Sequence, residues 1–335
     1  MRIDGRSNGR SPNGPPPAVV PVALLVTLLM IFAGPSASAS ASRSADWTRL
    51  HPSAPPPAAG GMAIAYDPAI GEVVMFGGYD AHHHLDETMA WDGSDWVPSA
   101  PGTAPSARAA AGMSFDGPSQ SLVLFGGFDG TAWLGDTWVW NAGGWVEQHP
   151  KHAPEAGTGP IMFTDPVNGH VDLFGGFDGT FYHSKTWQWR GSDWKLLHPA
   201  HTPAGRSSAA CALDEATGQV VLFGGIAELR TNDTWTWDGV DWTEELPAHQ
   251  PPVRFETASA YSGRLKAVVV FGGGSPDGQL GDTWAWTGAD WSRLAPKHAP
   301  STRGSAGMAW DAVTGRIVLV GGQHGSQVLH DTWTL

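Results

Sequence analysis

The chain has little cysteine, little tyrosine and few positive charges. Its 335 residues include one cysteine and four tyrosines, and 32 acidic residues against 19 lysines and arginines give a net charge of −13. The single cysteine, Cys211, excludes an internal disulfide. The acidic charge repels phosphate backbones, so nucleic acid is excluded as an expected partner. The sequence also contains no phosphate-binding glycine loop, no serine–histidine–aspartate motif and no zinc-ligand spacing.

Long hydrophobic runs are missing too, except for one near the N-terminus. Arg2, Arg6 and Arg10 precede an apolar run at residues 19–33, and alternating serine and alanine follow at 36–41. This order is typical of a secretory signal. We therefore expect a signal peptide at residues 1–41 and a secreted, extracellular domain at 42–335. The run is long for a signal, so a retained anchor is the alternative, and a membrane contact is expected only in that case.

A sequence motif that recurs six times indicates the architecture. A pair of glycines follows an apolar residue at steps of 49, 49, 49, 48 and 49 residues, and the residues that precede the pairs are Phe76, Phe125, Phe174, Phe223, Phe271 and Val320. Each pair leads to a Thr-Trp-x-Trp or similar segment, and in most repeats another tryptophan stands five residues later. A period near 50 residues is typical of propellers, in which each repeat is one four-stranded sheet.

One repeat predicts its strands clearly. We expect strands at 110–115, 122–125 and 137–140, and a fourth that begins at Trp145, with turn-forming residues between them. Period-two alternation places Trp138 and Trp140 on one face of the third strand. Because this tryptophan pair recurs at strand spacing, we interpret it as packing between adjacent sheets, with sugar stacking as the alternative.

The two ends of the repeat array complement each other. Residues 46–50 match a fourth strand, whereas residues 331–335 match a third strand. We therefore predict an all-β, six-bladed propeller whose last blade is completed by the N-terminal strand, which removes open sheet edges.

These features resemble the kelch-repeat family over residues 46–335. The Gly-Gly pairs, the fourth-strand tryptophans and Pro-x-x-Arg segments such as 105–108 and 300–303 carry the resemblance. It implies a kelch-type β-propeller similar to the central domain of galactose oxidase. The family contains binding modules, copper oxidases and sugar-acid epimerases, so the resemblance leaves the function open. We expect a monomeric recognition module with a protein or glycan ligand and no cofactor.

One face of the propeller is predicted to bind this ligand. The links between the second and third strands and those between blades emerge together, and they carry most of the histidines. The candidate binding residues on this face are Arg108, Arg206, Arg254, Arg303, His82, His84 and His183. Arginines at a channel mouth can hold a carboxylate or another polar group. Alternatively, each arginine pairs with the acid before its Thr-Trp segment, although one blade has Gly157 and Lys185 at these positions.

No metal site is assigned. Four histidines occupy one repeat position, and blades separate such positions by about 10 Å or more, which is too far for a shared ion. They are His152, His201, His249 and His298. His82 and His84, with Asp80 nearby, form a better metal candidate, but a chance surface cluster is the preferred interpretation.

Two enzymatic alternatives stay open. A copper oxidase resembling galactose oxidase would use tyrosine, histidine and a cysteine, and Cys211 and the Tyr182-His183 pair are the residues available. A sugar-acid epimerase would need an acid or base at the channel mouth, for which Glu256 and Glu228 are the candidates.

Overall fold

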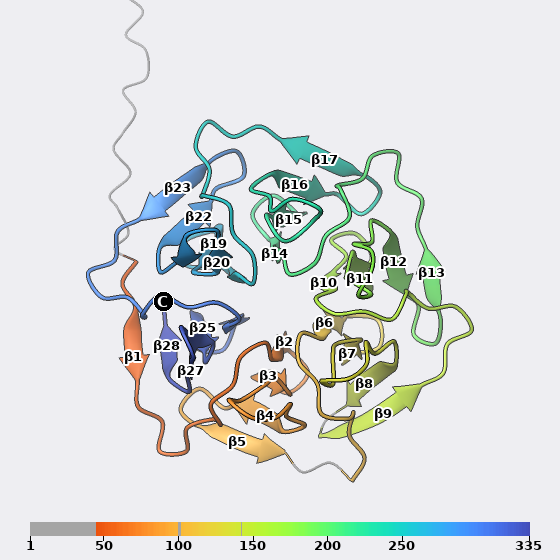
Figure 1. Cartoon of the computed structure of the whole chain (residues 1–335), viewed down its shortest axis with the longest axis horizontal. Helices are drawn as coiled ribbons and strands as arrows, with labels where there is room; N and C mark the ends of the chain where they lie inside the picture. The colour runs from red at the N-terminus through yellow and green to blue at the C-terminus, as the bar shows by residue number, and fades with distance from the viewer. Residues whose placement is uncertain (1–44, 100–101, 142) are drawn as a thin grey trace, which may run out of the picture. The chain divides into compact units, whose positions relative to one another are not determined.

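A computed structural model describes residues 45–99, 102–141 and 143–335. Strands and turns make up these residues, and no helix occurs among them. Six four-stranded antiparallel sheets form a ring, the six-bladed propeller that the repeat predicts (Figure 1). The expected signal peptide at 1–41 lies outside the described residues.

Each blade contains four strands, and the first strand of each lies closest to the ring axis (Figure 1). Blade 1 contains β2 Ala63–Asp67, β3 Glu72–Phe76, β4 Thr88–Trp91 and β5 Trp96–Ser99. Blade 2 contains β6 Gly112–Asp116, β7 Ser121–Phe125, β8 Thr137–Asn141 and β9 Gly144–Gln148. Blade 3 contains β10 Ile161–Thr164, β11 Val171–Phe174, β12 Thr186–Trp189 and β13 Trp194–Leu196.

The remaining blades follow the same plan. Blade 4 contains β14 Ala210–Asp214, β15 Gln219–Phe223, β16 Thr234–Trp237 and β17 Trp242–Glu245. Blade 5 contains β18 Ala258–Ser262, β19 Ala267–Phe271, β22 Thr283–Trp286 and β23 Trp291–Leu294. Blade 6 contains β24 Gly307–Asp311, β25 Arg316–Val320, β28 Thr332–Thr334 and β1 Thr48–Leu50. Two short hairpins extend the links of blades 5 and 6, namely β20 Gly274–Ser275 with β21 Gly278–Gln279, and β26 Gln323–His324 with β27 Gln327–Val328.

The strands of blade 2 lie within about two residues of their predicted bounds. The main difference is at Ala110, which was expected to begin the first strand. Its φ angle is +52°, and a left-handed residue cannot continue an extended strand, so β6 begins at Gly112. This conformation recurs in every blade and shapes the candidate site described below.

The hydrophobic core lies between neighbouring blades. The second tryptophan of each Thr-Trp-x-Trp segment is buried and faces the fourth-strand tryptophan of the same blade. The ring centroids of these pairs are 5.2–5.5 Å apart, in Trp91–Trp96, Trp140–Trp145, Trp189–Trp194, Trp237–Trp242 and Trp286–Trp291. Each pair packs on aliphatic side chains of an adjoining blade, as Trp96 does on Val318. The packing interpretation therefore holds for these rings.

A circular series of hydrogen bonds joins the blades. The indole Nε1–H of every fourth-strand tryptophan donates to the threonine that begins the third strand of the preceding blade, at 2.9–3.1 Å. The six pairs are Trp96–Thr332, Trp145–Thr88, Trp194–Thr137, Trp242–Thr186, Trp291–Thr234 and Trp47–Thr283. All these groups are buried, so each bond avoids the cost of an unpaired polar atom.

Blade 6 combines strands from both ends of the described chain. β1 pairs antiparallel with β28, with Thr48 opposite Thr334 and Leu50 opposite Thr332. Trp47, just before β1, is 1% exposed and packs edge-on against Phe271 at 5.3 Å. The fourth strand of this sheet is therefore supplied by residues 48–50.

Blade 3 contains two buried carboxyl groups. Asp172 of β11 occupies a position that is valine in the other five blades, and Asp165 lies in the turn before this strand. Gln188 Nε2 and Trp237 Nε1 donate to the Asp172 carboxyl at 2.7 and 3.0 Å. Burial raises the pKa of Asp172 well above its ordinary value, and the charge of Asp165 raises it further.

Candidate ligand-binding face and channel mouth

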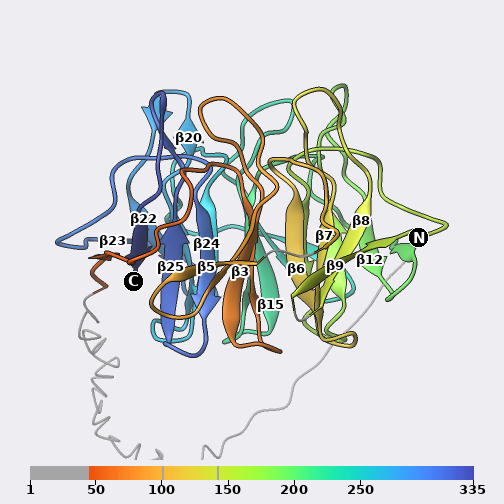
Figure 2. The same cartoon turned by 90° about the horizontal axis from the view of Figure 1, so that it is seen from below.

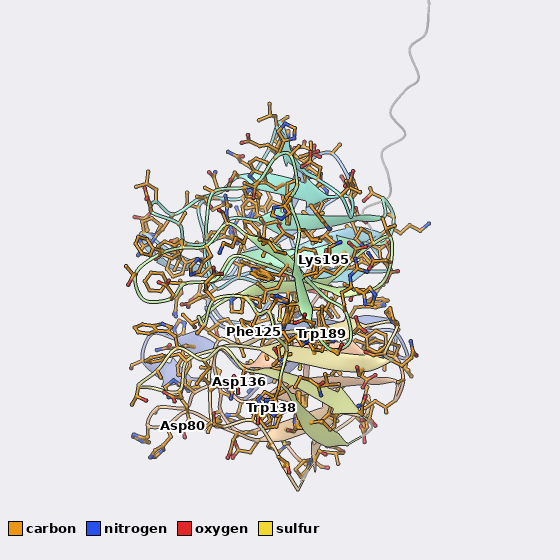
Figure 3. The ribbon with its side chains drawn as sticks, turned by 90° about the vertical axis from the view of Figure 1, so that its right-hand side faces the viewer. Asp80, Phe125, Asp136, Trp138, Trp189 and Lys195 are labelled. Carbon is orange, nitrogen blue, oxygen red and sulfur yellow. The ribbon has the colours of Figure 1, made fainter. Side chains whose placement is uncertain are left out.

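The links between second and third strands and those between blades emerge on one face of the ring, here called the link face. They form the longer loops at the side of the ring where β20 lies (Figure 2). Asp80, in the first of these links, lies at the edge of the molecule (Figure 3). The predicted site residues all belong to segments on or beside this face.

The four predicted arginines are buried in ion pairs. Their side chains are 0–1% exposed, and Nη1 and Nη2 donate to both carboxylate oxygens of one aspartate at 2.6–3.0 Å. The pairs are Arg108–Asp136, Arg206–Asp233, Arg254–Asp282 and Arg303–Asp331. Each Nη1 also donates to the carbonyl of the first glycine in the Gly-Gly pair. The structure thus shows the pairing that the sequence offered as the alternative to ligand contact.

The aspartate of each pair also accepts a bond from the first tryptophan of the following segment. Asp136 accepts from Trp138 Nε1 at 2.7 Å, and the two side chains lie side by side in Figure 3. Burial raises the pKa of Asp136, but the hydrogen bonds from Arg108 and Trp138 outweigh it, and the pKa is lowered overall. In blade 3, Lys185 occupies the position of this aspartate, so Trp187 Nε1 is buried without a partner, and Lys185 pairs with Glu155.

The four histidines at one repeat position brace the links between blades at the outer side of the ring. Each donates its backbone N–H to one carboxylate oxygen of an aspartate, and its Nδ1 lies 2.7–2.9 Å from the other. The pairs are His152–Asp193, His201–Asp241, His249–Asp290 and His298–Asp46. Their side chains are 70–74% exposed and belong to different blades, consistent with the bracing role rather than a shared metal.

The predicted histidines of the second-to-third-strand links have different surroundings. His82 is exposed, whereas His84 packs edge-on against Phe128 of the next blade at 5.7 Å. His183 Nε2 lies 3.0 Å from Asp178 Oδ2. Within the described parts of the chain, no three His, Cys, Asp or Glu residues form a group that could hold a metal ion.

A ring of left-handed residues surrounds the axis at the link face. In each blade, the residue two positions before the first strand has a positive φ angle, and the six values are 51–65°. The N–H of each donates to the carbonyl of its counterpart in the preceding blade, at 2.7–3.0 Å, and the six bonds close a circle. The members of this left-handed ring are Gly61, Ala110, Gly159, Ser208, Glu256 and Ser305. These N–H and C=O groups bond to one another around the ring. The groups that can contact a ligand at the channel mouth are therefore side chains.

A recess of about 220 Å³ opens at this ring, and we call it the mouth recess. It is lined by the ring residues together with Met62, Tyr79, Ala111, Pro160, Ile161, Ala209, Thr257 and Ala306. Glu256 is the only charged residue among these lining residues. The recess is smaller than the 300–1,000 Å³ typical of sites for drug-sized ligands, so it suits one end of a ligand.

Apart from Ser208 of blade 4, the polar side chains of the recess belong to blades 5, 6 and 1. Ser305 Oγ donates to Glu256 Oε2 at 2.7 Å, and Tyr79 Oη donates to Gln323 Oε1 at 2.6 Å. Burial raises the pKa of the Tyr79 phenol, and the Glu256 charge raises it further, whereas Ser305 lowers it by a hydrogen bond. A carboxylate, hydroxyl groups and a protonated phenol therefore converge on one side of the mouth.

Most residues that line the channel below the mouth have apolar side chains. A second cavity of about 190 Å³ shares Met62 and Ala111 with the recess and is lined by Ile64, Met113, Met162, Met308 and Cys211 among others. Burial raises the pKa of the Cys211 thiol, so it is a poor nucleophile or metal ligand. Tyr182 lies in a link and stacks on Phe177 at 4.6 Å, so its contacts give no support to the copper alternative.

The links of blades 2 to 4 carry exposed apolar side chains. Trp133 is 41% exposed, Phe181 is 66% exposed, and Leu229 in the next link is exposed as well. Trp133 packs on Phe128 at 5.5 Å and lies over Gly179 of the next link, where a Cβ would come within 2.5 Å of the indole. Its ring is therefore held in place with part of its surface open.

Comparisons with protein-family models and with curated proteins find no match to this chain. The function therefore has to be argued from the site itself. Across the described residues, no helix is long and apolar enough to span a membrane.

Sequence reasoning identified only part of the mouth. Glu256 was expected there as a candidate acid or base and does line the recess, whereas Glu228 is exposed in a link and lies outside it. Tyr79 and Ser305 were not identified as site residues. A usable signal was present, because each ring residue stands two positions after the arginine position of its repeat, and Glu256 is the one large residue there.

Proposed function

We propose that this protein is an exported, kelch-type recognition module that binds a glycan on its link face. The supporting observation is the indole of Trp133, a partly exposed aromatic surface fixed by Phe128 and Gly179. The C–H faces of sugar rings are apolar and flat, so they suit a preorganised aromatic ring.

The neighbouring links extend this surface. Phe181 projects from blade 3, next to the glycine over which Trp133 lies. A neutral glycan also avoids repulsion by the strongly acidic protein, which an anionic polymer would meet.

The sugar-acid epimerase alternative has weaker support. Glu256 lines the recess and could act as a base. However, a sugar acid carries a carboxylate, and the described residues that line the recess include no arginine, lysine or histidine to bind it. The four arginines that were predicted to bind a ligand on this face are already paired with aspartates.

A glycan array tests this proposal directly. We expect the purified protein to bind a subset of neutral glycans, and Trp133→Ala to weaken that binding about tenfold or more, because the variant loses about 1.4 kcal/mol or more of stacking. Gly179→Ala should weaken it too, since the new Cβ displaces the indole.

Val167→Ala and Val240→Ala are the matched controls. Both valines are exposed apolar residues in turns on the opposite face, so their loss should leave glycan binding unchanged. Binding to no glycan, or equal binding by Trp133→Ala and the wild type, would overturn the proposal. Binding of protein ligands alone would do the same.

A further inference from the structure

Glu256 is a carboxylate without a cation. Its side chain accepts a hydrogen bond from Ser305 Oγ, and no lysine, arginine or histidine of the described chain forms an ion pair with it. Arg254 is neutralised by Asp282, and Arg230 of the neighbouring link lies over the Phe255 ring, 4.8 Å from its centroid. Glu256 therefore brings the one charge among the residues that line the mouth recess, and no ion pair holds it.

The backbone at Glu256 supports a role for this side chain. Its φ angle is +51°, a conformation that glycine adopts without strain and that a residue with a Cβ adopts at a cost. Glycine occupies the same ring position in two other blades, and the small residues Ala110, Ser208 and Ser305 occupy it in the remaining three. A long acidic side chain at a place better suited to glycine indicates that the carboxylate is used.

The surroundings of Glu256 match an ammonium group. An ammonium has three donors and no acceptor, and the mouth offers the Glu256 carboxylate and the hydroxyl oxygens of Ser305 and Tyr79 as acceptors. The net charge of −13 draws cations towards the protein.

An aliphatic chain has a place beside this group. Met62, Pro160 and Ile161 line the recess and give it apolar surface. Methionine side chains are flexible and adapt to a thin apolar ligand. A primary ammonium on a short aliphatic chain is therefore complementary to the mouth in both charge and polarity.

We propose that the mouth recess binds an alkylammonium group, with the Glu256 carboxylate as its counter-ion and Met62, Pro160 and Ile161 as contacts for its aliphatic chain. Such a group can come from a free alkylamine or from a lysine side chain of a partner. This site is separate from the glycan surface around Trp133.

Three probes with the same carbon chain test the charge requirement by titration calorimetry. We expect hexylammonium to bind at least tenfold more tightly than hexan-1-ol, and hexanoate to bind more weakly still. Glu256→Gln should remove the preference for the cation and leave hexan-1-ol unaffected. Glu228→Gln, which changes an exposed glutamate of another link, is the matched control and should behave as the wild type.

Two further arms complete the test. Glu256→Gly should raise Tm, because it relieves the left-handed strain, and yet lose hexylammonium binding, a combination that a purely structural glutamate would not give. Tighter binding of Nα-acetyl-lysine amide than of hexylammonium identifies a lysine side chain as the source, and the reverse order identifies a free amine.

The proposal is overturned if hexylammonium and hexan-1-ol bind equally, or if Glu256→Gln keeps the cation preference. Trp133→Ala should leave hexylammonium binding intact, so a failure of the glycan proposal and a failure of this one are distinguishable.

Discussion

Replacing Arg206 by methionine should destabilise the propeller without a direct effect on ligand binding. The variant keeps much of the apolar stem but removes both donors to Asp233 and the donor to the Gly224 carbonyl. Breaking a buried ion pair costs about 3–5 kcal/mol, and we take the lower end because Asp233 is 26% exposed. At about 2–4 °C per kcal/mol for a domain of this size, Tm should fall by about 6–12 °C.

Thermal unfolding followed by circular dichroism measures this change. Lys185→Met is the matched control, since Lys185 pairs with Glu155 at the surface and its loss should cost about 1 kcal/mol or less. The reasoning would be refuted if Arg206→Met kept the wild-type Tm but lost glycan or hexylammonium binding, because the guanidinium would then act on the ligand.

The same variant has a defined pH dependence. Burial raises the pKa of Asp233, but the hydrogen bonds and charge of Arg206 outweigh it and lower the pKa overall. A group with a lowered folded pKa contributes stability above its unfolded pKa, about 3.9, and loses it as the pH falls through the folded value. The Tm difference between Arg206→Met and the wild type should therefore be full at pH 6 and shrink below about pH 4.

Two further predictions concern the buried carboxyl group of blade 3 and the first described strand. Because the folded pKa of Asp172 is raised, its contribution to stability falls as the pH rises above about 4. Asp172→Asn should thus gain Tm relative to the wild type between pH 5 and pH 8, and a constant difference across this range would contradict the assignment. Trp47→Ala removes a buried indole and its bond to Thr283, so denaturant unfolding should show a loss of about 3–5 kcal/mol. An unchanged unfolding midpoint would show that β1 does not stabilise blade 6.

The sequence predicts the fold well because the period counts the blades directly. The positions of strands follow from local alternation and turn residues, which act over a few neighbours. The Arg–Asp pairs could be predicted because both residues recur at fixed positions in four repeats. In a fifth repeat both are replaced, the arginine by Gly157 and the aspartate by Lys185. The left-handed ring was missed, since positive φ at Ala110 or Glu256 depends on contacts with the next blade.

The polar cluster of the mouth could not be predicted for a different reason. Tyr79, Glu256 and Ser305 belong to three blades and come together only when blade 6 packs beside blade 1. No spacing in the sequence reports this proximity. Asp172 is the opposite case, because an acid at a position that is otherwise valine is visible in the repeats, but its partner Gln188 shows only in the structure.

The circle of tryptophan-to-threonine bonds has a consequence for how the molecule unfolds. In a linear repeat array the outermost unit contacts one neighbour and can detach while the others persist. Here every blade donates one indole hydrogen bond to the preceding blade and accepts one from the following blade, so no blade is terminal. Detaching any blade breaks two junctions at once, which favours a single cooperative transition over stepwise fraying.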